Sequence, residues 1–108
     1  MTLSADLLRG YTDTLIMRQL AAEDGYGYGI SRTLAEKSSG MVRLKEATLY
    51  TAFRRMEENG YIRSYWGDED TGARRRYYSL TESGSEKLAE DTAAWVETRK
   101  IMDELLEV

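Results

Sequence analysis

The side chains of this chain with the clearest chemistry are cations and hydroxyl groups placed around one predicted helix. Residues 46–58 contain no Gly or Pro, and Leu49, Phe53 and Met56 repeat at helical spacing, which predicts a helix with one buried stripe. Arginines contact DNA phosphates, and short polar side chains contact base edges. The other side of this helix and the residue before it offer such groups: Lys45, Thr48, Tyr50, Thr51, Arg54 and Arg55.

Three consecutive arginines, Arg74, Arg75 and Arg76, form a second cationic group. The aromatic-rich stretches 61–66 and 76–80 predict two strands, and the Asp and Gly residues of 68–73 predict the turn of a hairpin. Arginines at such a tip can follow a phosphate backbone or enter a minor groove. The alternative, a solvated face of an ordinary α+β domain, is equally compatible with these residues alone.

The elements around this unit are less distinctive. Residues 3–22 predict a helix with Ser4 as its N-cap, and residues 30–37 predict a shorter helix that ends at Ser38-Ser39-Gly40. Residues 41–44 predict a short strand or an extended connector that pairs with the hairpin. Two helices, a third helix and a hairpin make a helix-turn-helix with a wing.

The C-terminal part of the chain predicts one long helix over residues 82–106, about 37 Å in length at 1.5 Å per residue. Its apolar residues recur at heptad-like spacing, interrupted by Thr92 and Arg99. So small a domain cannot cover this stripe, so we expect a homodimer; the alternative is a helix folded back on its own domain. The expected interface residues are Leu88, Trp95, Met102 and Leu106.

Charge and composition restrict the function further. The 108-residue chain has a net charge of −4, and residues 41–80 carry eight basic and six acidic side chains, whereas residues 81–108 carry three basic and eight acidic ones. An anionic partner is therefore expected to meet the middle segment. The absence of His and Cys excludes disulfides and the usual zinc and copper ligands, so no metal or cofactor is expected. No apolar run reaches bilayer length, which favours a cytoplasmic protein without membrane contact.

Catalysis has little support in the sequence. Asp68, Glu69 and Asp70 are acidic neighbours, but they fall in the predicted hairpin turn, where a solvated loop explains them. The alternating Gly25, Gly27 and Gly29 follow a helix and not a strand, so they do not match a nucleotide-binding fingerprint. We expect no catalytic residues and no enzymatic activity.

The segment from Glu46 to Glu82, with the strings ATLYT and G-x-R-R-x-Y-Y-x-L-T, resembles the PadR-like family of bacterial transcriptional repressors, in particular its short, LmrR-type multidrug-responsive members. This resemblance implies a mainly α member of the α+β class. Residues 1–80 would form a winged helix-turn-helix DNA-binding domain, and residues 81–108 a C-terminal dimerisation helix. The implied partner is a double-stranded, pseudo-palindromic DNA operator.

The resemblance also implies a ligand site. In LmrR-type proteins, a tryptophan from each subunit holds planar, often cationic, drugs in a pore at the dimer interface, and the gene under control encodes an efflux transporter. Trp95 is in register with that tryptophan, whereas Arg99 replaces an acidic residue and is expected to restrict or shift the ligand range. The expected ligand-binding residues are Leu7, Gly10, Asp13, Thr14, Asp91, Thr92, Trp95, Arg99 and Lys100.

Other functions stay open at this point. Trp95 can instead be a plain interface anchor, since tryptophan is common in that role. The chain can then be a winged-helix regulator that responds to another small molecule, such as a phenolic compound. It can also be a protein-interaction module without a ligand.

Overall fold

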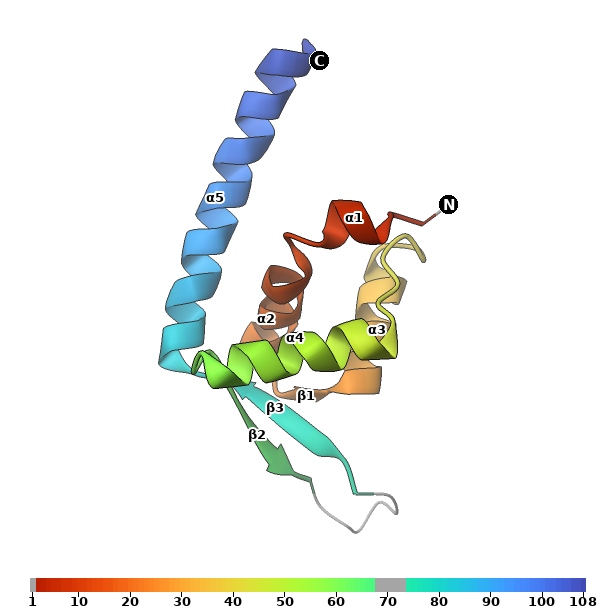
Figure 1. The fold of residues 1–108 in the computed structure, drawn as a ribbon, viewed down its shortest axis with the longest axis vertical. Coiled ribbons are helices and arrows are strands. Elements are labelled where there is room, and N and C mark those ends of the chain that lie inside the picture. The colour runs from red at the N-terminus through yellow and green to blue at the C-terminus, as the bar shows by residue number, and fades with distance from the viewer. Residues whose placement is uncertain (1, 68–73) are drawn as a thin grey trace.

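Helices make up most of the chain, and a small sheet lies at one end of them (Figure 1). The computed structural model describes residues 2–67 and 74–108. The class is α+β and mainly α, as predicted. In chain order the elements are α1 (Ala5–Leu8), α2 (Thr12–Ala22), β1 (Gly25–Tyr26), α3 (Gly27–Lys37), α4 (Glu46–Glu58), β2 (Ile62–Trp66), β3 (Arg76–Leu80) and α5 (Glu82–Leu106).

The hydrophobic core lies where α2, α3 and α4 meet the sheet. The stripe predicted for α4 is buried, and Phe53 of that helix stacks on Tyr78 of β3 with ring centroids 4.0 Å apart. Ile16 and Met17 of α2 fill the same core and are almost fully buried. The stripe therefore fixes which face of α4 points inward, and the polar face is left on the surface.

The sheet is antiparallel, and its strand order is β1-β3-β2. Strands β2 and β3 confirm the predicted hairpin, whose turn at 68–73 lies outside the described residues. The third strand is β1, so the prediction that residues 41–44 pair with the hairpin was wrong. Tyr26 of β1 packs its ring edge-on against Tyr77. Residues 41–44 have no aromatic side chain to make such a contact, and they form an irregular connector.

The N-terminal region also differs from its prediction, because the single helix expected over 3–22 is divided into α1 and α2. Ser4 does cap α1, since its hydroxyl accepts the amide hydrogen of Leu7 at 3.2 Å. Gly10 in the break disfavours a continuous helix. The backbone N–H of Tyr11 and the hydroxyl of Thr12 both donate to the carbonyl of Leu8, at 2.8 and 3.0 Å, and close the turn.

Helix α3 begins three residues before the predicted start, at Gly27. A Cβ on this glycine would lie 2.7 Å from the Tyr50 hydroxyl and 3.3 Å from a Leu49 methyl, so a larger side chain would collide with α4. Gly27 is therefore explained by close packing of two helices, a reason that no local pattern contains.

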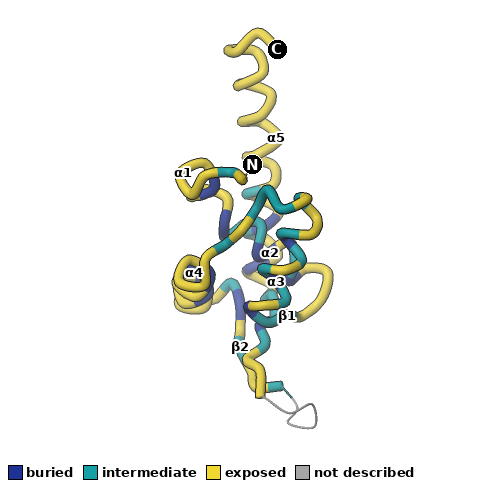
Figure 2. Tube along the Cα trace, turned by 90° about the vertical axis from the view of Figure 1, so that its right-hand side faces the viewer, coloured by how far each residue is buried: buried dark blue, intermediate teal, exposed yellow. Residues whose placement is uncertain are grey.

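Helix α5 has the predicted bounds and is capped by Thr81, whose hydroxyl accepts the amide hydrogen of Gly84 at 3.0 Å. Its first turns are packed on the domain through Gly84 and Leu88, which are buried. Beyond Asp91 every residue of the helix is exposed. The C-terminal turns of this half extend away from the other elements (Figures 1 and 2). Across residues 2–67 and 74–108, no helix combines the length and apolarity that a membrane crossing requires.

Candidate nucleic-acid interface and adjoining groove

The outward face of α4 carries the residues predicted to contact DNA. The structure leaves this face in solvent, because the buried residues of α4 all lie on its core side (Figure 2). The face combines cations with hydroxyl groups, which suits both phosphates and base edges. Its exposed members are Lys45, Thr48, Tyr50, Thr51, Arg54 and Arg55.

Tyr50 lies at one flank of this face and has a fixed ring. The ring meets Phe53 edge-on at 5.6 Å, and its hydroxyl lies over Gly27 at the start of α3. The side chain is still 42% exposed. The tyrosine therefore presents a positioned edge to solvent.

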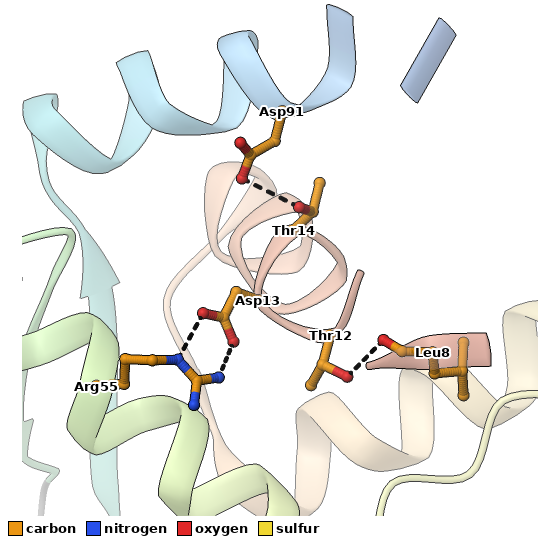
Figure 3. Close-up of polar contacts among 6 residues, drawn as sticks. All are labelled: Leu8, Thr12, Asp13, Thr14, Arg55 and Asp91. Carbon is orange, nitrogen blue, oxygen red and sulfur yellow. Dashed lines mark hydrogen bonds and ion pairs between the residues drawn. The ribbon is translucent and has the colours of Figure 1, made fainter. Parts of the chain in front are cut away.

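Arg55 lies at the opposite flank and is paired with Asp13 of α2. Its Nε and Nη2 atoms donate to the two carboxylate oxygens of Asp13 at 3.0 and 2.5 Å (Figure 3). The hydrogen bond to Asp13 raises the pKa of Arg55 above its ordinary value, so the guanidinium is charged at any physiological pH. The arginine and aspartate side chains are 50% and 31% exposed, and such a pair contributes roughly 0–1 kcal/mol to stability.

The arginines of the hairpin rest on aromatic rings. The guanidinium groups of Arg74 and Arg76 lie 5.3 and 5.5 Å from the Trp66 ring, and that of Arg75 lies 4.6 Å from the Tyr26 ring. Cation–π contacts of this kind hold a charged group in place without neutralising it. Arg76 also donates to the hydroxyl of Ser64 in β2, at 2.6 Å.

A ladder of tyrosines joins the hairpin to the rest of the domain. Tyr65 of β2 stacks on Tyr77 of β3 at 5.8 Å, and Tyr77 meets Tyr26 of β1 edge-on at 5.5 Å. The Tyr65 hydroxyl donates to the Asp24 carboxylate at 2.5 Å, and this bond raises the pKa of Tyr65. Tyr65 therefore stays protonated and donates this hydrogen bond throughout the neutral range.

An open groove of about 1150 Å³ lies beside α4, between the N-terminal helices and α5. In this groove Trp95 of α5 meets Tyr11 edge-on, with ring centroids 5.2 Å apart. The groove is also lined by Thr48, Thr51 and Arg55 of α4, so it adjoins the predicted DNA-binding face. It brings together five predicted ligand residues: Gly10, Asp13, Thr14, Asp91 and Trp95. Outside its lining are Leu7, Thr92, Arg99 and Lys100.

The first turn of α2 contacts both α4 and α5 beside this groove (Figure 3). Asp13 reaches α4 through Arg55, and the hydroxyl of the next residue, Thr14, donates to Asp91 of α5 at 3.2 Å. Asp91 also forms an ion pair with Lys87 at 3.1 Å. Asp13 and Asp91, the two acidic residues among the expected ligand-binding residues, are therefore already paired with cations of the chain.

Two groups of site residues were missed by the sequence interpretation. Tyr11 falls within the continuous helix predicted over 3–22, although it lies between α1 and α2 and packs on Trp95 at the groove. Asp24 and Tyr26 fall between the helices predicted over 3–22 and 30–37 and were given no role, although they support the hairpin. Only the pairing of β1 with β3 places them there, and no local signal indicated that pairing.

The residues predicted for a dimer interface fall into two sets. Leu88 belongs to the core of its own domain and is 8% exposed, so it has little surface to offer a partner. Trp95, Met102 and Leu106 are 41%, 46% and 65% exposed on the free half of α5.

Known proteins share this arrangement. The sequence profile of the family described as "Transcriptional regulator PadR-like family" matches residues 16–90. The solved structure of a transcriptional regulator from Clostridium thermocellum is similar, with 41% identity, a TM-score of 0.85, and 92% of this chain and 96% of that chain covered. A PadR family transcription regulator from Clostridium difficile has 39% identity and a TM-score of 0.81, with 90% of this chain and 99% of that chain covered.

A protein from Lysinibacillus sphaericus is 37% identical over 103 residues, which is 95% of this chain and 94% of its relative. These matches extend over α4, the hairpin and the start of α5 alike. The chain belongs to the PadR-like family of transcriptional regulators.

Proposed function

We propose that this protein is a homodimeric, cytoplasmic, non-enzymatic repressor that binds a pseudo-palindromic DNA operator through α4 and the hairpin. The observation that carries the proposal is the exposed polar face of α4 in a PadR-like regulator whose hairpin holds Arg74 and Arg75 on aromatic rings. Such a face supplies groups for base edges in the major groove, while the hairpin arginines follow the phosphates beside it.

The dimer is inferred from the free half of α5. The helix face that buries Gly84 and Leu88 continues along the same side to Trp95 and Met102, where it lies in solvent. A continuous exposed apolar surface is a common mark of a protein–protein interface. A second copy packed on this half would cover the face and hold two copies of α4 at a fixed spacing. The two half-sites would then lie about 34 Å apart, or a multiple of that distance.

The groove beside Trp95 supports a ligand-responsive repressor. The indole is half-exposed next to Tyr11, and two such aromatic walls suit a planar aromatic molecule. We propose that such molecules, including cationic drugs, bind near Trp95 between the two copies and weaken DNA binding. The gene under control would encode an efflux transporter. A ligand can shift the equilibrium only by its difference in affinity for the two states.

DNA binding is tested by selecting duplexes from a random library with the wild-type protein and measuring the affinity of the selected duplex by fluorescence anisotropy. The variant R74A/R75A is expected to lose roughly tenfold or more in affinity, with a salt dependence shallower by about 1.8 in log–log slope, because two phosphate contacts are lost. The matched control R18A/R32A removes the same charge from α2 and α3 and is expected to bind as the wild type does.

If the wild-type protein selects no duplex, the DNA-binding function is excluded. If R74A/R75A and R18A/R32A weaken binding equally, the hairpin is not part of the interface and only net charge matters.

A further inference from the structure

The pair formed by Arg55 and Asp13 sits where the DNA-facing helix adjoins the groove. Arg55 is exposed on α4, in the same helix face as Arg54 and Thr51. Its guanidinium engages both oxygens of one carboxylate, at 3.0 and 2.5 Å. Arginine binds a phosphate in this same two-point geometry. The carboxylate of Asp13 thus occupies the position on Arg55 that a DNA phosphate would take.

The pair is also easy to open. Half of the arginine side chain and about a third of the aspartate side chain are accessible to solvent, so water and salt screen their attraction. Elsewhere on the described surface the ion pairs Asp6–Arg9 and Arg32–Glu36 are local, whereas Arg76–Glu57 joins β3 to α4 at 3.9 Å. The Asp13–Arg55 pair instead joins two helices across 42 residues of sequence.

We propose that Asp13 competes with a DNA phosphate for Arg55, so that the arginine exchanges the carboxylate for the phosphate when DNA binds. The inference rests on the proposed DNA-binding function and adds a residue that lowers and tunes affinity. Asp13 acts through Arg55 and is a positioning residue, not a DNA contact.

The position of Asp13 connects this exchange to the rest of the groove. Its neighbour Thr14 donates to Asp91, one helical turn before Trp95 on α5. A displacement of α5 relative to α2 would therefore move the first turn of α2 and change how firmly Asp13 holds Arg55 (Figure 3). Occupation of the groove and release of DNA would then be linked through one ion pair.

The test measures the affinity of the duplex selected by the wild-type protein over a series of salt concentrations. D13N keeps an oxygen that accepts a hydrogen bond from Arg55 but removes the charge. We expect D13N to bind the duplex roughly fivefold more tightly near 100 mM salt, with a log–log slope steeper by about 0.9. In the wild type, the cation taken up by the freed Asp13 carboxylate offsets the counterion released from the phosphate, and D13N removes this offset. D13E, which restores the charge, is expected to return the slope to the wild-type value.

Two further variants separate the exchange from net charge. D6N removes the same charge from the pair with Arg9 on α1, and its slope is expected to equal that of the wild type. In an R55Q background, which lacks the exchanging group, D13N is expected to leave the slope unchanged. Thermal unfolding of each variant checks that the fold is intact.

The proposal is overturned if D13N and D6N change affinity and slope equally, or if D13N weakens binding as R55Q does. The second outcome would make Asp13 a support that holds Arg55 toward the DNA. Failure of the wild-type protein to bind any duplex would instead exclude the DNA-binding function itself, and with it the exchange.

Discussion

At the scale of single residues, Trp95 is either a plain interface anchor or a ligand-binding residue. The two roles differ in how much of its ring a dimer would cover. It is 41% exposed, contacts Tyr11, and lies on the helix face that we propose to be covered by a second copy. A plain interface anchor would be fully covered in the dimer, whereas a ligand-binding tryptophan would keep one ring face open to the groove. A planar probe distinguishes these states, because it can stack only on an open face.

Titration with the planar cationic dye Hoechst 33342 is therefore expected to quench tryptophan fluorescence in a saturable way. W95F is expected to abolish the saturable part, while W66F, which removes the hairpin indole that lies beside Arg74 and Arg76, is expected to retain it. Saturable quenching that survives in W95F, or none in the wild type, would leave Trp95 as an interface anchor only.

Tyr65 illustrates support of the hairpin by a single hydroxyl group. Y65F keeps the stack on Tyr77 but removes the hydrogen bond to Asp24, so the hairpin loses one connection to the α2–β1 turn. We expect weaker binding of the selected duplex with an unchanged salt slope, because no charge is lost. Y28F alters a tyrosine that is 69% exposed on α3 and serves as the matched control. Equal affinities of Y65F and Y28F would show that the hydroxyl does not position the hairpin.

At the scale of elements, the start of α5 depends on one close approach. A Cβ on Gly84 would lie 2.1 Å from the Tyr61 carbonyl oxygen, so the helix and the residue before β2 touch backbone to backbone. This contact sets the direction in which α5 leaves the domain. The direction of α5 in turn places the free half of the helix (Figure 1). It also places Trp95, which lines the groove.

G84A is expected to lower the free energy of unfolding by about 1–3 kcal/mol, since the backbone must shift to admit the methyl group. G10A is the matched control, because a Cβ on Gly10 has no atom within 4 Å among the described residues. Its effect is expected to stay within about 0.5 kcal/mol. Urea denaturation followed by circular dichroism measures both. Equal stability of G84A and the wild type would mean that α5 adjusts its direction freely.

At the scale of the whole molecule, the free half of α5 extends beyond the rest of the chain. The protein measures 54 × 32 × 21 Å, and much of its length is the free half of α5. Covering the exposed apolar side chains of that half would be favourable in water. In the proposed dimer, a second copy of matching length and pattern covers them.

M102E is expected to shift the protein from dimer to monomer in sedimentation velocity experiments, because it places a charge in the proposed interface. V96E introduces the same charge about a quarter turn away from the Trp95 side, and we expect it to remain dimeric. Operator affinity of M102E is expected to fall as well, since two linked half-sites bind more tightly than one. A monomeric wild-type protein would contradict the proposed dimer directly.

Much of the fold could be predicted from the sequence, because it depends on local patterns. The stripe of Leu49, Phe53 and Met56 predicts α4, the aromatic stretches predict the hairpin, and the heptad-like spacing over 82–106 predicts α5. All three have nearly the observed bounds. The exposed polar face of α4 follows from the same periodicity, because burying one stripe leaves the opposite side in solvent.

The tertiary structure decided what depends on contacts between distant parts of the chain. Three such contacts join residues from separate parts of the chain: the pairing of β1 with β3, the packing of Tyr11 on Trp95, and the Asp13–Arg55 pair. Helical and strand periodicity report only which side of an element is apolar, and not which neighbour covers it. The sequence by itself therefore determined the family, helices α4 and α5, and the basic hairpin. Only the packing of α2 against α4 and α5 placed the candidate ligand groove beside the exposed polar face of α4.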